Sequence, residues 1–144
     1  MIKNIRITQC AFEDCAAILD LWNASGSAKS VTDRLAILEN LTRTSGDLFL
    51  VAKIGDKITG SVIGGWDGWR AHVYRLAVLP EFRRRRIAEL LMRELERRLI
   101  SKGALRIFSL VESHKPEAVN FWNSSSANDY QYADGVGLYV KNVA

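Results

Sequence analysis

Residues 73–99 read VYRLAVLPEFRRRRIAELLMRELERRL, and their periodicity changes once, across the basic run in the middle. The alternation in residues 73–78 predicts a β-strand, because side chains at i and i+2 share one face of a pleated strand. Pro80 ends that strand. From Arg86 onward the apolar residues recur at helical spacing and form one stripe, which comprises Ala88, Leu91, Met92, Leu95 and Leu99. The sequence therefore predicts a strand, a tight basic turn and a helix in succession.

The opposite face of this helix is charged. Glu89 precedes Arg93 by four residues and Glu94 precedes Arg98 by the same spacing, in the acid-first order that favours ion pairing along a helix. We therefore expect this face to lie in solvent.

The basic turn contains Arg83, Arg84, Arg85 and Arg86 and lies at the predicted start of the helix. The first turn of a helix has backbone N–H groups without intrahelical acceptors, and the aligned peptide dipoles place about half a positive charge there. A phosphate can therefore bind at such a position mainly through backbone N–H groups. The residues alone allow two interpretations, an anion-binding site or a solvated run of charge.

Residues 78–88, VLPEFRRRRIA, resemble the acetyl-CoA signature of the GNAT superfamily of N-acetyltransferases, V-x-P-x-x-[RQ]-x-x-G-x-[GA]. The matching positions are Val78, Pro80, Arg83 and Ala88. Arg86 stands where the family has a glycine that lets the backbone approach the pyrophosphate. Arg86 is compatible with donor binding if its side chain points away from the ligand or adds a contact to a phosphate. Otherwise it weakens binding.

The resemblance covers nearly the whole chain and implies that residues 1–144 are a single N-acetyltransferase domain. The implied fold is α/β, with a central mixed sheet that contains splayed parallel strands and is flanked by about four helices. The implied donor is acetyl-CoA. Its expected contacts are Leu76, Ala77, Val78, Arg83, Arg84, Arg85, Arg86, Ile87, Ala88, Asn120 and Trp122.

In the family, the pantetheine arm enters the wedge between two adjacent parallel strands and pairs with backbone as an extra strand would. The corresponding strands here are residues 73–78 and 105–111. The resemblance places the backbone N–H of Val78 where it would bind the thioester oxygen and stabilise the tetrahedral oxyanion.

An amine must lose its proton before it attacks, so a general base is expected. Some family members have a glutamate six residues before the last valine of the central strand, and His72 occupies that position here. An imidazole suits a base near neutral pH. However, simple alternation puts His72 on the face of Leu76 and Val78, and a structural histidine is the alternative. Glu112 is the second candidate base.

Residues 118–123, AVNFWN, resemble the family segment whose tyrosine protonates the departing thiolate, and Trp122 takes the place of that tyrosine. An indole N–H donates a hydrogen bond but does not deliver a proton. Either solvent protonates the thiolate or Tyr130 substitutes as the general acid.

The rest of the chain follows from periodicity and turn residues. Further strands are predicted over residues 2–8, 48–54, 57–63, 130–132 and 136–140, and helices over residues 12–22, 31–41 and 116–122. Gly103 is the expected left-handed residue after the central helix. Residues 64–70 are expected to form a mobile, aromatic loop. The resulting order, β-α-α-β-β-β-α-β-α-β-β, is the order of the resembled family.

Some residues are expected at the acceptor site by analogy with that family. Trp22, Asn23 and Ser25 follow the first helix, and Trp66 and Asp67 lie in the glycine-rich loop. The alternatives are a Trp22 buried at the end of its helix and a Trp66 that covers the end of the sheet.

Composition narrows the class of protein. The chain has 144 residues, a net charge of +4 and no apolar run of the roughly 20 residues that span a bilayer. Its N-terminus lacks the apolar region of a signal peptide, so a cytoplasmic location is expected. Cys10 and Cys15 have no metal-like spacing and are expected to be reduced, buried thiols.

We therefore predict an acetyltransferase that moves acetyl from acetyl-CoA to a primary amine by direct attack in a ternary complex. The acceptor is expected to be a small molecule or a peptide, with no nucleic acid and no membrane as partner, and a homodimer is one predicted state. The alternative is a catalytically degenerate domain that binds CoA or a regulatory partner. A nucleic-acid-binding module is disfavoured, because Glu89, Glu94 and Glu96 interrupt the basic helix.

Overall fold

The computed structural model describes residues 4–143. The chain forms two compact units, Met1–Leu110 and Val111–Ala144. Of the predicted first strand, residues 2 and 3 lie outside the described residues, and the rest corresponds to β1 (Ile5–Gln9).

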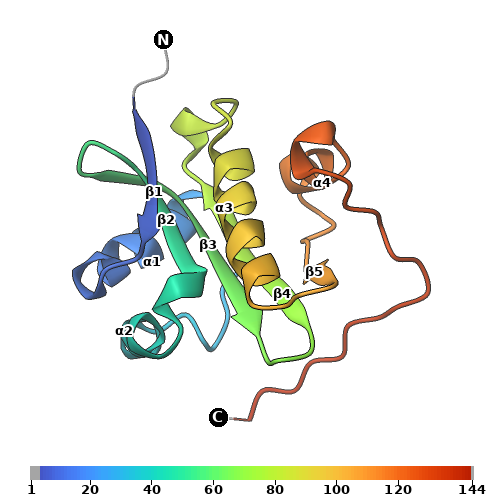
Figure 1. Ribbon diagram of the computed structural model, residues 1–144. Helices are drawn as coiled ribbons and strands as arrows, with labels where there is room; N and C mark the ends of the chain where they lie inside the picture. The colour runs from blue at the N-terminus through green and yellow to red at the C-terminus, as the bar shows by residue number, and fades with distance from the viewer. Residues whose placement is uncertain (1–3, 144) are drawn as a thin grey trace. The chain divides into compact units, whose positions relative to one another are not determined.

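A five-stranded sheet with the order β1-β2-β3-β4-β5 forms the centre of the first unit (Figure 1). The other strands are β2 (Phe49–Ile54), β3 (Lys57–Trp66), β4 (Ala71–Val78) and β5 (Ile107–Ser109). Neighbouring strands are antiparallel except β4 and β5, which are parallel. This mixed sheet, with helices packed on it, confirms the predicted fold class.

The predicted hairpin is present, and Gly55 in the turn between β2 and β3 has a φ of +60°. β3 is longer than predicted, since residues 64–66 continue the strand instead of starting a mobile loop. The loop before β4 is confined to residues 67–70. The glycine-rich composition of this region was therefore misinterpreted, because glycine also serves close packing within a strand.

The central helix, α3 (Ile87–Ser101), lies across the front of the sheet in Figure 1. Its buried apolar side chains are Ile87, Leu91, Met92, Leu95 and Leu99. Ala88 was predicted in this stripe but is only half-buried, because Ile87 faces the sheet in its place. Gly103 has a φ of +109° just beyond the helix, as predicted.

One charged residue of α3 departs from the predicted solvent-exposed face. Glu89 is only 8% exposed, and its carboxylate pairs with Arg86 at 2.5 Å and with Arg93 at 3.1 Å. These two exposed arginine side chains cover the carboxylate that they neutralise. Glu94 pairs with Arg98 as predicted, and hydrogen bonds from Arg97 and Arg98 lower its pKa to about 2.

Two helices pack through one apolar cluster, α1 (Cys15–Ala24) and α2 (Leu35–Thr44). α2 was predicted to begin at Val31, but it begins four residues later. The backbone N–H of Ser30 donates to the Asp33 carboxylate at 3.0 Å, and such side-chain contacts compete with helix formation. The turn stabilised by this contact occupies residues 30–33, so α2 begins only after it.

Cys10 and Cys15 are both free and buried, as predicted. Burial is the main cause that raises the pKa of each thiol above its usual value. The protonated thiol is the inert form, so neither side chain has the environment of a reactive cysteine.

The second unit contains α4 (Pro116–Trp122), with Pro116 in its first turn as predicted. The strands predicted at 130–132 and 136–140 are absent from residues 111–143. The alternating apolar side chains there lie in solvent, with Leu138 at 68% exposure and Tyr139 at 97%. A two-stranded hairpin with no buried face is marginal in water, so alternation alone did not suffice to form one.

Four short 3₁₀ helices complete the described structure: η1 (Phe12–Asp14), η2 (Gly46–Leu48), η3 (Pro80–Phe82) and η4 (Ser125–Ala127). Within residues 4–143, every helix is too short or too polar to cross a bilayer.

Gly64 permits the close approach of α3 to β3. A Cβ at this position would lie 2.5 Å from Leu95 Cδ1, and Leu95 is fully buried and cannot simply move away. We predict that Gly64→Ala lowers the free energy of unfolding by about 1–3 kcal/mol, measured by urea denaturation. Gly46→Ala is the matched control, because its new Cβ would meet nothing nearer than 3.8 Å. Equal midpoints for the two variants would contradict this account.

Candidate active site

A β-bulge interrupts β4. Ser61 pairs with Ala77 and Ile63 pairs with Tyr74, so one residue of β3 lies opposite two of β4. Arg75, within the bulge, has a φ of +55°, a left-handed conformation that a non-glycine residue rarely adopts. An extra residue in a strand moves every following side chain to the other face of the sheet.

The bulge places His72 on the face opposite Val78, which contradicts the parity expected from simple alternation. Gly60, the partner of Val78, faces α3, since a Cβ there would lie 3.0 Å from Ile87. Gly65, the partner of His72, faces away from α3, since its Cβ would lie 3.3 Å from the Tyr74 ring. His72 and Tyr74 therefore lie together on the face opposite α3.

The parallel pair β4–β5 separates partway along β4. Pairing runs from Ala71↔Ile107 to Val73↔Ser109 and is not continued along β4 in the described residues. β5 is thus shorter than the strand predicted over residues 105–111, and Leu105 is 99% exposed. The second half of β4 has an edge without a β5 partner, as the predicted wedge requires.

The backbone N–H of Val78 points toward this edge. The adjacent Leu79 N–H donates to the carbonyl of Thr59 at 2.9 Å, on the β3 side. Successive backbone groups of a strand point to opposite edges, so the Val78 N–H is directed to the β5 side. This is the orientation that an oxyanion donor in the wedge would need.

The basic turn keeps a glycine-like backbone. Arg84 and Arg86 each have a φ of +64°, and Arg86 is the N-cap of α3. Each left-handed arginine costs about 1 kcal/mol relative to glycine. The Arg86 guanidinium binds Glu89 with hydrogen bonds of 2.5 and 3.2 Å. Arg86 therefore adopts a backbone conformation that glycine accommodates without strain, while its side chain is held by α3.

The other arginines of the turn have different surroundings. Arg83 Nη2 donates to the carbonyl of Ser25 at 3.2 Å, and Arg85 lies 5.1 Å from the centre of the Phe82 ring. Arg84 is exposed. The turn thus combines a helix N-terminus with fixed positive charge, which fits the phosphates of a nucleotide-linked donor.

Three rings stack where β4 and β5 begin to separate. The His72 ring lies 5.5 Å from that of Phe108, its partner in the parallel pair, and 5.9 Å from that of Tyr74. We call His72, Tyr74 and Phe108 the aromatic shelf. Of these three residues, the sequence pattern indicates only His72, because the other two join it through the register and the bulge of β4 and β5.

Asp67 is the acidic neighbour of the aromatic shelf. Its Oδ1 accepts the backbone N–H groups of Trp69 at 2.8 Å and Arg70 at 2.7 Å. These bonds, with a smaller contribution from His72, lower the pKa of the Asp67 carboxyl. Burial, followed by the Asp67 charge, raises the pKa of Tyr74. Asp67 is therefore a persistent anion near the ring of His72.

A network links the α1–α2 connection to the bulge. Arg75 forms an ion pair of 2.5 Å with Asp33 and lies 4.8 Å from the Trp22 ring. Trp22 Nε1 donates to Ser61 Oγ at 2.9 Å, and that hydroxyl donates to the carbonyl of Arg75 at 3.1 Å. Trp22 is 4% exposed. It therefore acts as a buried support of the bulge, the structural alternative considered for it.

The remaining predicted site residues belong to the second unit. Glu112 pairs with Lys115 at 3.1 Å, and the Trp122 ring meets the Tyr130 ring edge-on at 4.8 Å. Asn120 is exposed on α4. The roles that resemblance assigns to Glu112, Asn120, Trp122 and Tyr130 stay predictions. Within residues 4–143, no cluster of side chains could hold a metal ion.

A wedge in a mixed sheet beside a basic turn at a helix N-terminus is the arrangement that the resemblance to acetyltransferases implies. A family model described as the acetyltransferase (GNAT) family matches residues 15–125. An acetyltransferase of Pectobacterium atrosepticum is 32% identical over 88% of this chain and 87% of its own length. One of Sodalis glossinidius is 30% identical over 91% and 90%. The chain belongs to the GNAT acetyltransferase family and is an acyltransferase.

Solved structures of acetyltransferases have a similar fold. The PaiA N-acetyltransferase from Thermoplasma acidophilum, solved in complex with coenzyme A, superposes with a TM-score of 0.78. The alignment covers 93% of this chain and 94% of the other at 20% identity. At this level of identity the likeness concerns the fold.

The Arg75–Asp33 ion pair holds the α1–α2 connection against the bulge. We predict that Asp33→Asn and Arg75→Gln each lower the free energy of unfolding by about 1–3 kcal/mol, because each leaves a charged, largely buried partner. The double variant should lose less than the sum, and urea denaturation measures the coupling. The exposed pair Asp47–Lys102 at 2.7 Å is the matched control, with expected coupling below about 1 kcal/mol. If the two changes in unfolding free energy were strictly additive in the double variant, the ion pair between Asp33 and Arg75 would not contribute to stability.

Proposed function

We propose that this protein transfers acetyl from acetyl-CoA to a primary amine by direct attack in a ternary complex. The observation that carries the proposal is the free edge of β4 beside the left-handed basic turn at the start of α3. A thioester supplies an activated acyl group with a good leaving group. The chain's own groups must therefore bind the donor, polarise its carbonyl and deprotonate the amine.

The donor site is proposed along β4 and α3. The backbone of residues 76–78 would pair with the amides of an extended pantetheine arm, as an added strand does. Arg83, Arg84, Arg85, Arg86, Ile87 and Ala88 would surround the pyrophosphate, mainly through N–H groups of the turn and helix start. The Val78 N–H would stabilise the oxyanion. By resemblance, Asn120 and Trp122 are proposed as further donor contacts.

The proposed base is His72, with Glu112 as the second candidate. The stacking of His72 on Phe108 close to where the β4–β5 pairing ends, with Asp67 nearby, supports the first choice. Tyr130 or solvent is proposed to protonate the thiolate.

The domain and the partners are proposed from coverage and resemblance. We propose that residues 1–144 act as one N-acetyltransferase domain. The support is that a single family model matches residues 15–125, which is most of the chain. A small-molecule or peptide amine is the proposed acceptor, and a homodimer is the proposed assembly.

A second function has specific support. Arg86 replaces a glycine and is bound to Glu89, while Trp122 replaces the tyrosine of the resembled segment. A catalytically degenerate domain that binds CoA or a regulatory partner would tolerate both changes. Donor binding followed by a turnover assay separates the two functions.

Calorimetric titration with acetyl-CoA tests the donor site. We predict micromolar binding, and we predict that Arg83→Ala raises Kd on the order of tenfold, because a charge-assisted contact to phosphate is lost. Arg97→Ala is the matched control, since Arg97 is an exposed arginine of α3 that pairs with Glu94 at 2.5 Å. Failure of the wild-type protein to bind acetyl-CoA would overturn the proposed function. Equal affinities for both variants would remove Arg83 from the donor site.

The pH dependence of turnover tests the base, with an amine that the protein acetylates. We predict that His72→Ala lowers the rate on the order of 100-fold at neutral pH and much less at high pH, where the free amine needs no base. The readout is trapping of the released CoA thiol. His114→Ala is the control, because His114 is exposed and lies outside the aromatic shelf. An unaltered pH profile in His72→Ala would assign the base elsewhere.

A further inference from the structure

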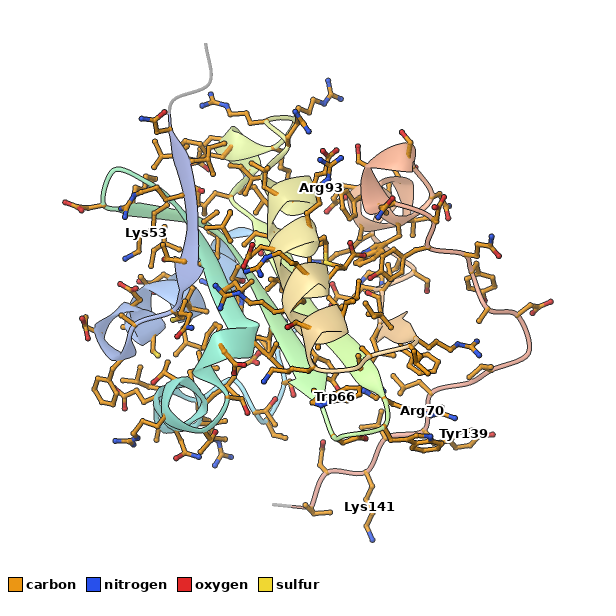
Figure 2. The ribbon with its side chains drawn as sticks, in the orientation of Figure 1. Lys53, Trp66, Arg70, Arg93, Tyr139 and Lys141 are labelled. Carbon is orange, nitrogen blue, oxygen red and sulfur yellow. The ribbon has the colours of Figure 1, made fainter. Side chains whose placement is uncertain are left out.

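Two arginines flank the aromatic shelf. The guanidinium carbons of Arg70 and Arg106 each lie 5.1 Å from the centre of the Phe108 ring, and that of Arg70 also lies 4.2 Å from the Trp69 ring. Figure 2 labels Arg70 near the start of β4. Among the described residues, no carboxylate forms an ion pair with either arginine.

Stacking holds these two charges without neutralising them. A guanidinium over an aromatic face loses side-chain freedom yet keeps its N–H donors available at its edge. Five other arginines of the first unit differ in this respect, since Arg75, Arg86, Arg93, Arg97 and Arg98 are paired with carboxylates. Arg70 and Arg106 are therefore preorganised for an anion that the protein itself does not provide.

The aromatic shelf lies at the closed end of the wedge. β4 and β5 pair at His72↔Phe108 and separate after Val73↔Ser109. A donor arm that pairs with residues 76–78 would bring its acyl end toward this vertex. An acceptor amine would then approach across the shelf, with Arg70 and Arg106 beyond it.

The carboxylates near the shelf have unequal roles. Asp33 is neutralised by Arg75 at 2.5 Å and offers no free charge. Asp67 is exposed, its pKa is lowered, and it lies near His72. Asp67 Oδ1 accepts the backbone N–H of Arg70 at 2.7 Å, and Arg70 and Arg106 each precede the paired residues of their strands, so this anion and the two cations lie at the same end of the β4–β5 pair. In a molecule that carries both an amine and a carboxylate, the carboxylate would meet the two arginines beside Phe108 while the amine meets His72, which stacks on the same ring.

We propose that the acceptor is an amine that also carries a carboxylate, as an amino acid or an acidic dipeptide does, with the carboxylate bound by Arg70 and Arg106. This inference rests on the proposed function. The amine nitrogen forms its bond to the acetyl carbonyl carbon, and the C–S bond of the thioester breaks. Sulfur leaves as a thiolate, and the proton lost by the amine goes to His72. A polyamine has no group for the two arginines and repels them.

The test uses matched acceptors in which a carboxylate is replaced by the neutral amide. The pairs are phenylalanine with phenylalaninamide and glycyl-glutamate with glycyl-glutamine, with spermidine as a polycation, and the released CoA thiol is measured at saturating acetyl-CoA. Amidation of the phenylalanine carboxyl lowers the pKa of its amine and leaves more free base. A preference for phenylalanine therefore cannot arise from amine reactivity. We expect KM for the carboxylate member of each pair to be on the order of tenfold lower.

Variants assign the preference to the two arginines. Arg70→Gln and Arg106→Gln should each raise KM for the carboxylate acceptor on the order of tenfold, leave KM for the neutral partner unchanged, and leave acetyl-CoA affinity unchanged. Arg70→Lys should restore part of the difference. Arg43→Gln is the matched control, since Arg43 lies 5.5 Å from the Phe12 ring on α2 and is equally a stacked, exposed arginine.

Equal KM values within each pair, or a preference for spermidine, would overturn the assignment of the acceptor while leaving acetyl transfer intact. A preference for carboxylates that persists in both glutamine variants would overturn the role of Arg70 and Arg106. Binding of acetyl-CoA without acetylation of any of these amines would count against the proposed transfer itself. The inference would fall with it.

Discussion

The bulge in β4 is the constraint on which the rest of this molecule depends. One additional residue, accommodated by Arg75 in a left-handed conformation, moves His72 and Tyr74 to the face opposite Val78. Hydrogen bonds link Trp22 to Ser61 and Ser61 to the Arg75 carbonyl within the bulge, and Asp33 forms an ion pair with the Arg75 side chain. An arginine in this conformation costs about 1 kcal/mol, and loss of either partner of its ion pair would leave the other charge unpaired and largely buried. The contacts of the Arg75 side chain thus hold the residue in the conformation that the bulge requires.

The basic turn follows a similar balance of local cost and tertiary gain. Arg84 and Arg86 both adopt a left-handed backbone conformation, and Arg86 does so at the position where the resembled signature has glycine. The Glu89 carboxylate, 8% exposed, binds the Arg86 side chain, so the substitution changes the surface of the turn more than its path. Electrostatic attraction to a phosphate can come from the helix start and Arg83 even when the Arg86 charge is engaged. A non-glycine residue at this position is thus compatible with an anion site.

Local patterns predicted much of the fold. The strand, basic turn and helix of residues 73–99 form as expected, since each is specified by contacts within a few residues, and the hairpin around Gly55 does so too. The errors lie where a distant partner decides. β3 continues through Gly64 because α3 packs closely against the strand at that residue. The alternating segment near Leu138 forms no strand, because none of its side chains is buried. The turn at Asp33 delays α2 through a side-chain contact that periodicity does not include.

By itself, the sequence determined the type and order of the central elements, the place of the basic turn, the buried thiols and the resemblance to acetyltransferases. Each follows from spacing along the chain, because helical and strand periodicities and short motifs are local properties. Only the tertiary structure decided which face His72 occupies, that Phe108 and Tyr74 stack on it, and that Arg75 binds Asp33. These contacts depend on a strand bulge and on the register of a parallel pair. Both are set by packing between segments distant in sequence, so no local pattern carries them.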